Sequence, residues 1–341
     1  MKCSVIGIDL AKNVFQICAL DEKRQVLFNK KVKRTQLLQE LAQFEPTLVV
    51  TEACYSSNPW GRRIQALGHT VKCVPAFMVK PFVVGGKNDR NDALAIAEAA
   101  LRPKIRFVEI KSVEQQDIQS LFQIRQLLIR QKNALSNQLR GLLAEYGEVM
   151  PKGYVHLRKL LPDVLENPNN ELSNISREFF HQINDNILAI SNQIKEIETK
   201  IESLIQNKPS HQRISQIPGV GPIISSAIHA FVNDASAFKN GRQFSAWIGL
   251  TPKQYASGET NRLGHITKRG NSALRRLLIQ GSHILIIHCE KTDTPFNLWL
   301  RQLKQRMPRG KCVVAVANKL ARVIWHILAH DEAFSQEKVC Y

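Results

Sequence analysis

Two aspartates stand three residues apart in the segment KNDRNDA at residues 87–93. A spacing of three places Asp89 and Asp92 on one face of a helix, where two carboxylates repel each other unless a cation lies between them. Helix capping explains either residue alone, because Asp is favoured at the N-cap and in the first turn. Capping does not explain Asp9 and Glu52, which end the apolar stretches CSVIGID and TLVVTE.

These four acids form a set whose chemistry would be phosphoryl transfer. Both apolar stretches predict strands, and open α/β sheets bind ligands at the carboxyl ends of their strands. If the helix that contains the aspartate pair abuts those ends, four carboxylates converge. Two Mg²⁺ ions bound by them would activate an attacking oxygen and stabilise a leaving oxygen on phosphorus. An acid order of Asp, Glu, Asp-x-x-Asp across strand, strand and helix is what an RNase H-like nuclease core requires. We therefore predict four catalytic metal ligands, Asp9, Glu52, Asp89 and Asp92.

A serine in the short segment ASG is the second candidate for chemistry. Ser257 stands among cations, since the sequence from Lys239 to Arg276 has eight Lys and Arg and one acid, Glu259. A serine in a turn is usually only a turn residue. A serine hydroxyl is also a poor nucleophile at neutral pH without a metal ion or a base. Composition alone therefore favours a turn residue over a nucleophile.

The charge of the whole chain indicates an anionic partner. The 341 residues include 47 Lys and Arg against 29 Asp and Glu, a formal net charge of +18, and nucleic acid is the commonest partner for such an excess. Residues 299–325 form a second basic strip, with seven Lys and Arg and no acid. A solvated face normally mixes signs, so we interpret both strips as contacts for phosphate.

The segment QIPGVGPIISSAI, residues 216–228, fits a helix-hairpin-helix element. Its Gly-x-Gly bend would leave backbone N–H groups at a helix N-terminus free to hold a phosphate without reading bases. An ordinary Pro/Gly connection between helices is the alternative. With this turn and the basic segments, the predicted nucleic-acid contacts are Lys87, Arg90, Gly219, Gly221, Lys253, Arg262, Lys268, Arg269, Asn271, Arg275 and Arg276.

The elements that must position these residues fall into three segments. Residues 1–110 predict an α/β domain, because their strands are apolar enough to be covered on both faces, and the strands are expected over 3–9, 14–20, 47–52 and 69–74. Residues 111–207 predict long helices with a coiled-coil seam. That seam consists of Leu121, Leu128, Leu135 and Leu142, with Ile118 and Leu139 between them, and a 4-3-4-3 series of apolar residues from Ile183 to Leu204.

Residues 208–341 predict a mainly α-helical, basic C-terminal domain. Its segment GSHILIIHCE could supply zinc ligands in His283, His288 and Cys289, but its apolar residues recur at helical spacing and favour a core helix. The chain has seven scattered cysteines and no uncharged apolar run of about 18 residues. We therefore expect a cytoplasmic, nucleoid-associated bacterial protein with no membrane partner.

Several motifs, taken in order, resemble those of the IS110 family of insertion-sequence transposases, and of its IS1111 branch in particular. They are GIDLAKN, VVTEA, K-N-D-x-x-D-A, I-P-G-V-G-P, A-x-x-G-L-x-P, S-G and I-T-K-R-G-N-x-x-L-R-R-L. The resemblance spans nearly the full chain. The acid set and the block that follows S-G are specific jointly, although each alone would be weak.

The resemblance implies a RuvC-like DEDD domain, a coiled-coil linker and a C-terminal transposase domain with a nucleophilic serine. It gives the acids as Asp9, Glu52, Asp89 and Asp92 and the serine as Ser257. It also implies a structured non-coding guide RNA from the same element, which pairs with donor and target DNA. Members of the family assemble as homo-oligomers, here a dimer or a tetramer, in which the acids of one subunit can meet the serine of another.

Three functions follow as hypotheses. The first is an RNA-guided DNA transposase or recombinase that uses Mg²⁺ and a phosphoserine intermediate. The second is a RuvC-like Holliday-junction or structure-specific endonuclease, which would use the same acids with water as nucleophile and would tolerate loss of Ser257. The third is a non-catalytic nucleic-acid-binding scaffold, which would tolerate loss of Asp9. The residues alone rank the first two nearly equal, and the resemblance favours the first.

Overall fold

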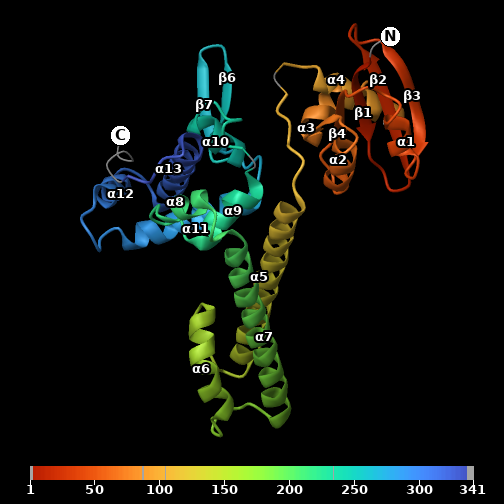
Figure 1. Ribbon diagram of the computed structural model, residues 1–341. Helices are drawn as coiled ribbons and strands as arrows, with labels where there is room; N and C mark the ends of the chain where they lie inside the picture. Colours follow the sequence, from red (N-terminus) through yellow and green to blue (C-terminus); the bar gives the residue numbers. More distant parts are fainter. Residues whose placement is uncertain (1–2, 87, 104, 233, 336–341) are drawn as a thin grey trace. The chain divides into compact units, whose positions relative to one another are not determined.

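The structure is a computed structural model that divides into two compact units, Met1–Val113 and Glu114–Tyr341 (Figure 1). The buried apolar clusters of the first unit are separate from those of the second, so each unit has a core of its own. The residues that the structure describes are 3–86, 88–103, 105–232 and 234–335.

The first unit is built on a five-stranded mixed sheet. Its strands are β1 (Cys3–Asp9), β2 (Val14–Asp21), β3 (Val26–Lys33), β4 (Leu48–Glu52) and β5 (Thr70–Val74). They lie in the order β3-β2-β1-β4-β5, where β1, β2 and β3 pair antiparallel and β4 and β5 continue parallel to β1. This confirms the α/β character of the N-terminal region, and the four predicted strands agree with observed ones to within one residue.

Helices cover both faces of this sheet. They are α1 (Leu37–Leu41), α2 (Ser57–Gln65), α3 (Ala76–Val79), the 3-10 helix η1 (Lys80–Phe82) and α4 (Asp89–Ala100). Helices α1 and α2 share a cluster with Ile6 and Ile8 of β1, whereas α4 shares one with Val5. Because alternate residues of a strand point to opposite faces, Gly7 and Asp9 lie on the face that α4 covers.

Helix α4 crosses strand β1 at Gly7, where no side chain would fit. A Cβ atom on Gly7 would lie 2.5 Å from the carbonyl oxygen of Ala93 and 2.8 Å from the Cβ of Ala97. A glycine on the strand and alanines on the helix therefore allow a close approach. This contact holds α4 against β1 two residues before Asp9.

Three helices begin the second unit: α5 (Val113–Glu145), α6 (Tyr154–Glu166) and α7 (Asn174–Ile205). Helices α5 and α7 run antiparallel, because the start of α5 shares a cluster with the end of α7 and the end of α5 shares another with the start of α7 (Figure 1). On α7, Phe180, Ile187, Ile194 and Ile201 are buried at intervals of seven residues. The pair packs within one chain, and a coiled coil in the strict sense stays a prediction.

The seam of α5 agrees with the predicted one in part, since the predicted Ile118 and Leu139 are buried. The four leucines from Leu121 to Leu142 are half-buried, whereas the buried side chains of the helix are Ile118, Phe122, Ser136, Leu139 and Leu143. The leucines flank the interface that faces α7 and α6. A repeat of seven identifies a stripe on a helix, but residues next to the stripe share the same period.

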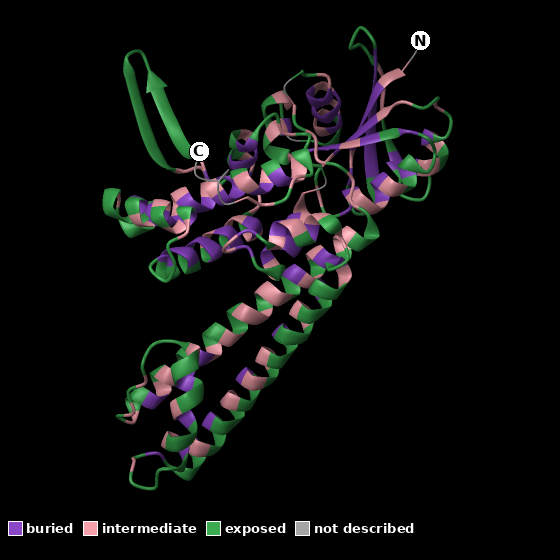
Figure 2. Ribbon diagram, turned by 60° about the vertical axis from the view of Figure 1, so that its left-hand side comes forward, coloured by how far each residue is buried: buried purple, intermediate pink, exposed green. Residues whose placement is uncertain are grey.

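The rest of the second unit is mainly helical. Its elements are α8 (Pro209–Ser215), α9 (Pro222–Phe231), α10 (Gly241–Ile248), β6 (Pro252–Ser257), β7 (Thr260–Ile266), α11 (Ser272–His288), α12 (Pro295–Arg306) and α13 (Arg309–His330). Among the described helices α13 alone is long and apolar enough to cross a membrane, but its buried residues pack on α10 and α11, as expected of a core helix. The hairpin of β6 and β7 projects from this core and is exposed along almost its whole length (Figure 2).

Candidate active site

Asp9 and Glu52 lie at the same edge of the sheet, at the ends of neighbouring parallel strands. Ile8 and Thr51 are the last paired residues of β1 and β4, and each acid follows by one residue. Both are half-buried, and both make interactions within the protein. Glu52 follows Val50 by two residues, as Asp9 follows Gly7, so both acids belong to the α4 side of the sheet.

The first turn of α4 begins with an asparagine cap. Asn88 has extended backbone angles, and its side-chain oxygen accepts a hydrogen bond of 2.8 Å from the backbone N–H of Asn91. Asp89 is therefore the first residue inside the helix and not its N-cap. This removes the capping explanation for Asp89 and leaves the favourable interaction of both aspartates with the positive end of the helix dipole.

Asp89 lies at the level of Asp9 on the sheet. Its carboxylate is 3.9 Å from the Nζ of Lys31 on β3. Lys31 pairs with Gln16 on β2, and Gln16 pairs with Asp9 on β1, so these residues form one row across the sheet. Asp92 directly precedes Ala93, which packs on Gly7 of the adjacent row.

A chain of amide hydrogen bonds ties this row to α4. The Nδ2 of Asn29 donates to the backbone carbonyl of Arg90 at 2.9 Å, and the Nε2 of Gln16 donates to the Oδ1 of Asn29 at 2.6 Å. Gln16 is 4% exposed, and its Oε1 has no hydrogen-bond partner in the described structure. Gln16 was not among the predicted site residues, although it follows the motif GIDLAKN by only three residues.

The acids lie toward the same end of the sheet, but their side chains are not close enough together to form a metal-binding cluster. Among the described residues, no group of three or more His, Cys, Asp and Glu side chains stands close enough to hold a metal ion. Arg90 is exposed next to Asp89. Lys87, predicted to meet phosphate, lies outside the described residues.

Ser257 occupies the tip of the β6–β7 hairpin in the second unit. It pairs with Thr260 across a two-residue turn, Gly258–Glu259. Gly258 has a φ of 56°, and a positive φ at the first central position is what a type II′ turn requires. The serine expected in a turn is thus the last residue of a strand, and the residue is exposed.

Three further side chains share the face of the hairpin that carries Ser257. Tyr255 and Arg262 are directly paired across the strands, two residues from the tip, and Lys253 follows on the same face. Tyr255 is 60% exposed, and its ring lies next to Gly264, whose added Cβ would be 3.2 Å from the ring. An aromatic ring with two cations is a surface suited to bases and phosphates.

The base of the hairpin is closed by two glycines with positive φ. A Cβ on Gly249 would lie 2.0 Å from the carbonyl oxygen of Arg269, and one on Gly270 would lie 1.8 Å from that of Trp247. Lys268 between them also has a positive φ, of 54°. The backbones of the segments A-x-x-G-L and K-R-G-N therefore cross here, at a distance that only glycine allows.

Two predicted nucleic-acid contacts have structural roles at this crossing. The side chain of Asn271 caps α11 by accepting from the backbone N–H of Leu274 at 2.9 Å. The guanidinium of Arg275 donates to the backbone carbonyl of Ile248 at 2.8 Å, and burial lowers its pKa. The exposed cations around them, which stay predicted contacts, are Lys268, Arg269 and Arg276.

The turn between α8 and α9 holds the predicted glycines in two different environments. Gly219 has a φ of 77°, and a Cβ there would lie 2.6 Å from Leu285 and 3.1 Å from the carbonyl oxygen of Gly281, so it packs against α11. Gly221 is the residue before α9, and an added Cβ would meet no atom within 4 Å. Only Gly221 thus faces open space, and phosphate binding at this turn stays a prediction.

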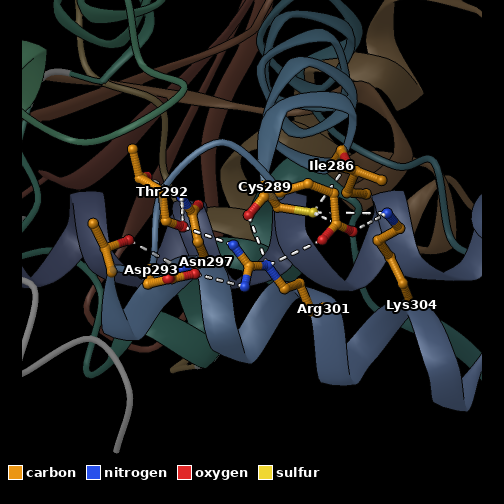
Figure 3. Close-up of polar contacts among 9 residues, drawn as sticks. Ile286, Cys289, Thr292, Asp293, Asn297, Arg301 and Lys304 are labelled. Carbon is orange, nitrogen blue, oxygen red and sulfur yellow. Dashed lines mark hydrogen bonds and ion pairs between the residues drawn. The ribbon is translucent and has the colours of Figure 1, made fainter.

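The second basic strip is partly neutralised by acids of its own unit (Figure 3). Arg301 lies 3.1 Å from Glu290 and 2.8 Å from Asp293, and Lys304 lies 2.7 Å from Glu290. The hydrogen bond from Lys304 lowers the pKa of the Glu290 carboxyl. Arg301 also donates to the carbonyl of Cys289, so these cations fasten the α11–α12 loop.

Comparison with known proteins gives two matching family models and several relatives that span nearly the whole chain. A family model described as "Transposase", of the DEDD type, matches residues 6–148, and one described as "Transposase IS116/IS110/IS902 family" matches residues 211–296. A probable family 20 transposase of Pseudomonas aeruginosa is 39% identical over 98% of this chain and 99% of its own. The transposase for insertion sequence element IS1111A of Coxiella burnetii is 38% identical over 97% of this chain and 91% of its own.

The α/β unit with acids at its strand ends and the basic second unit are thus those of a DEDD transposase, an enzyme that cleaves and recombines DNA. The chain belongs to the IS110 family of transposases. The transposase for element IS1328 of Yersinia enterocolitica, 34% identical over 98% of this chain and 99% of its own, is a further relative of nearly equal length.

Proposed function

We propose that this transposase is an RNA-guided recombinase that exchanges DNA strands through a phosphoserine formed at Ser257. The observation that carries the proposal is the exposed position of Ser257 at the tip of a hairpin whose same face presents Tyr255, Arg262 and Lys253. A nucleophile for DNA must reach a phosphate between bulky neighbours, and a projecting hairpin supplies that reach.

The first unit would supply the metal-dependent part of the reaction. The strand order β3-β2-β1-β4-β5, with acids as the last residues of β1 and β4 and at the start of α4, supports an RNase H-like, RuvC-like domain. Oxygen donors of this kind suit Mg²⁺, and the unpartnered Oε1 of Gln16, the cross-strand partner of Asp9, is a further oxygen at this end of the sheet. We expect Asp9, Glu52, Asp89 and Asp92 to draw together around the ions, because carboxylates at one edge repel each other without them.

The strand-transfer step balances without any external energy source. The Oγ of Ser257 attacks phosphorus and forms an ester bond, the bond from phosphorus to the leaving deoxyribose oxygen breaks, and the proton lost by serine is matched by one taken up by the leaving oxygen. One phosphoester replaces another, so a second DNA hydroxyl can later displace the serine. Bound Mg²⁺ would polarise the phosphate and favour ionisation of the serine hydroxyl.

A guide RNA accounts for the kind of surface that the second unit presents. Its exposed cations at the hairpin and at its base suit backbone phosphates, and shape and charge suffice where base pairing reads the sequence. The RNA would come from the same element and pair with donor and target DNA. The active assembly would be a homo-oligomer.

The test uses the full-length protein with Mg²⁺, DNA that carries the element end and target, and RNA transcribed from the DNA that flanks the gene. We expect a covalent protein–DNA adduct on a denaturing gel, mapped by mass spectrometry to Ser257, and no adduct with Ser257→Ala. Thr260→Ala is the matched control, because it removes the other hydroxyl at the same turn. Strand joining by Ser257→Ala would overturn the serine mechanism, and joining without RNA would overturn guidance.

A further inference from the structure

We infer that Gln16 is a further oxygen ligand of the metal site formed by the four acids, an inference that rests on the proposed function. The starting observation is that Gln16 is 4% exposed and its Oε1 makes no hydrogen bond in the described part of the chain. A buried polar atom without a partner costs about 1–3 kcal/mol, so its presence needs an explanation, and one next to a set of carboxylates has a direct one in a bound cation.

The hydrogen-bond chain decides which atom of the Gln16 amide stays open. The carbonyl of Arg90 can only accept, so Asn29 must donate to it through Nδ2. The remaining Oδ1 of Asn29 can only accept, so Gln16 must donate to it through Nε2. The free atom is therefore the oxygen, which can bind a cation, and not the NH₂ group, which would repel one.

The position of Gln16 brings this oxygen to the acids. Gln16 is the cross-strand partner of Asp9, and paired residues point to the same face of a sheet. That face is the one covered by α4, since Cys18 and Leu20 of the same strand pack there. Nε2 is committed to Asn29 on β3, and the cross-strand partner of Gln16 on its other side is Asp9 of β1.

The same network connects the ligand to the helix that carries the other two acids. Because Asn29 holds the backbone of Arg90, which follows Asp89 directly, Gln16 and the first turn of α4 are fastened together. A neutral ligand is also useful beside four carboxylates, because it adds an oxygen donor without adding charge. Amide oxygens of Gln are common ligands of hard divalent cations.

The experiment measures cation binding without requiring strand exchange. Thermal midpoints of the full-length protein are recorded in EDTA and across a Mg²⁺ titration, and Mn²⁺ binding is followed by electron paramagnetic resonance. Gln16→Met keeps the length of the side chain but lacks the oxygen, and Gln16→Glu adds a fifth carboxylate. Thr267→Val is the matched control, because it removes another buried oxygen without a partner, in the other unit.

We expect the two Gln16 variants to change both the cation affinity and the stability in EDTA in opposite directions. Gln16→Met should be at least as stable as the wild type in EDTA and should bind the cation about 10-fold more weakly. Gln16→Glu should be less stable in EDTA and should respond to less Mg²⁺. Thr267→Val should leave the cation response unchanged.

Asp9→Asn separates failure of the inference from failure of the proposed metal site. A Mg²⁺ response that Asp9→Asn abolishes but that Gln16→Met and Gln16→Glu leave unchanged would overturn the role of Gln16 alone. A wild-type protein that binds neither cation would overturn both. If Gln16→Met failed to fold, its thermal midpoint in EDTA would be lost. The comparison of Gln16→Glu with the wild type would then decide the inference.

Discussion

At the residue scale, the approach of helix to strand beside the acids depends on the absence of one side chain. We predict that Gly7→Ala destabilises the first unit by about 1–3 kcal/mol, because the new Cβ would meet backbone atoms of α4 at 2.5 and 2.6 Å, and backbone atoms cannot move aside as a side chain can. Displacement of α4 would also move Asp89 and Asp92 away from Asp9. Strand cleavage should therefore fall further than the loss of folded protein explains.

Chemical denaturation and a cleavage assay at equal folded concentration check this prediction. Gly86→Ala is the matched control in the same unit, since an added Cβ there meets nothing within 4 Å and the residue has no positive φ. It should leave both the free energy of unfolding and cleavage within about 0.5 kcal/mol of wild type. Equal effects of the two alanines would refute the packing argument.

Residue identity predicted which acids end strands, but it did not predict which residue caps α4 or which side chains form hydrogen bonds within the protein. Asp89 and Asn88 are both good cap residues, and only backbone angles show that Asn88 is the cap. Asn271 and Arg275 stand in a basic motif and were predicted to touch nucleic acid, yet their side chains hold α11 and the chain before the hairpin. The open oxygen of Gln16 depends on three strands in register, which no local pattern contains.

At the element scale, the packing of α8 on α9 buries His211 and leaves His229 half-buried. His211 hydrogen-bonds Ser225 at 2.7 Å, His229 lies 3.3 Å from Ser210, and the two rings are 6.1 Å apart. Burial, followed by repulsion from His211 and Lys208, lowers the pKa of His229 to about 4, although Glu114 opposes this. Burial also lowers the pKa of His211, against an opposing effect of Glu202.

These directions predict that the helix pair loses stability in mild acid. Above pH 6.5 His229 is neutral in both states, and between pH 6.5 and about 4 the unfolded chain binds a proton that the folded chain does not. The free energy of unfolding should fall by about 2–3 kcal/mol over this window. His229→Gln should flatten the fall in thermal midpoint, and exposed His265→Gln should not. A parallel decline in both variants would show that another group is responsible.

Elements were predictable where their apolar period was clean and uninterrupted. Strands β1, β2, β4 and β5 are apolar runs, and they appeared within a residue of their expected ends. Strand β3, with the sequence VLFNKKVK, was missed because it is a sheet-edge strand with four exposed residues, and the polar run NKKVK interrupts its apolar start. The β6–β7 hairpin was missed for the same reason, since none of its residues is buried to give an alternating pattern.

At the scale of the whole molecule, the charge of +18 is not one uniform field. Around the hairpin, cations such as Lys253 and Arg262 have no acid in ion-pairing distance among the described residues, whereas Arg301 and Lys304 are paired with Glu290 and Asp293. The first group is available to phosphate, and the second is already used by the fold. Total charge therefore overstates the nucleic-acid footprint.

This difference predicts which lysines and arginines set the salt dependence of DNA binding. If Lys253 and Arg262 each neutralise a phosphate, replacing both by Gln should lower the slope of log affinity against log salt by about 2, at roughly 0.9 per duplex contact. Lys304→Gln removes a positive charge that is already paired with Glu290 of the same chain, and it should leave the slope unchanged. Filter binding of an element-end duplex between low and high salt measures the slopes. Equal slopes for the hairpin variant and Lys304→Gln would mean that DNA contacts the protein elsewhere, because counterions are released only where phosphate is met.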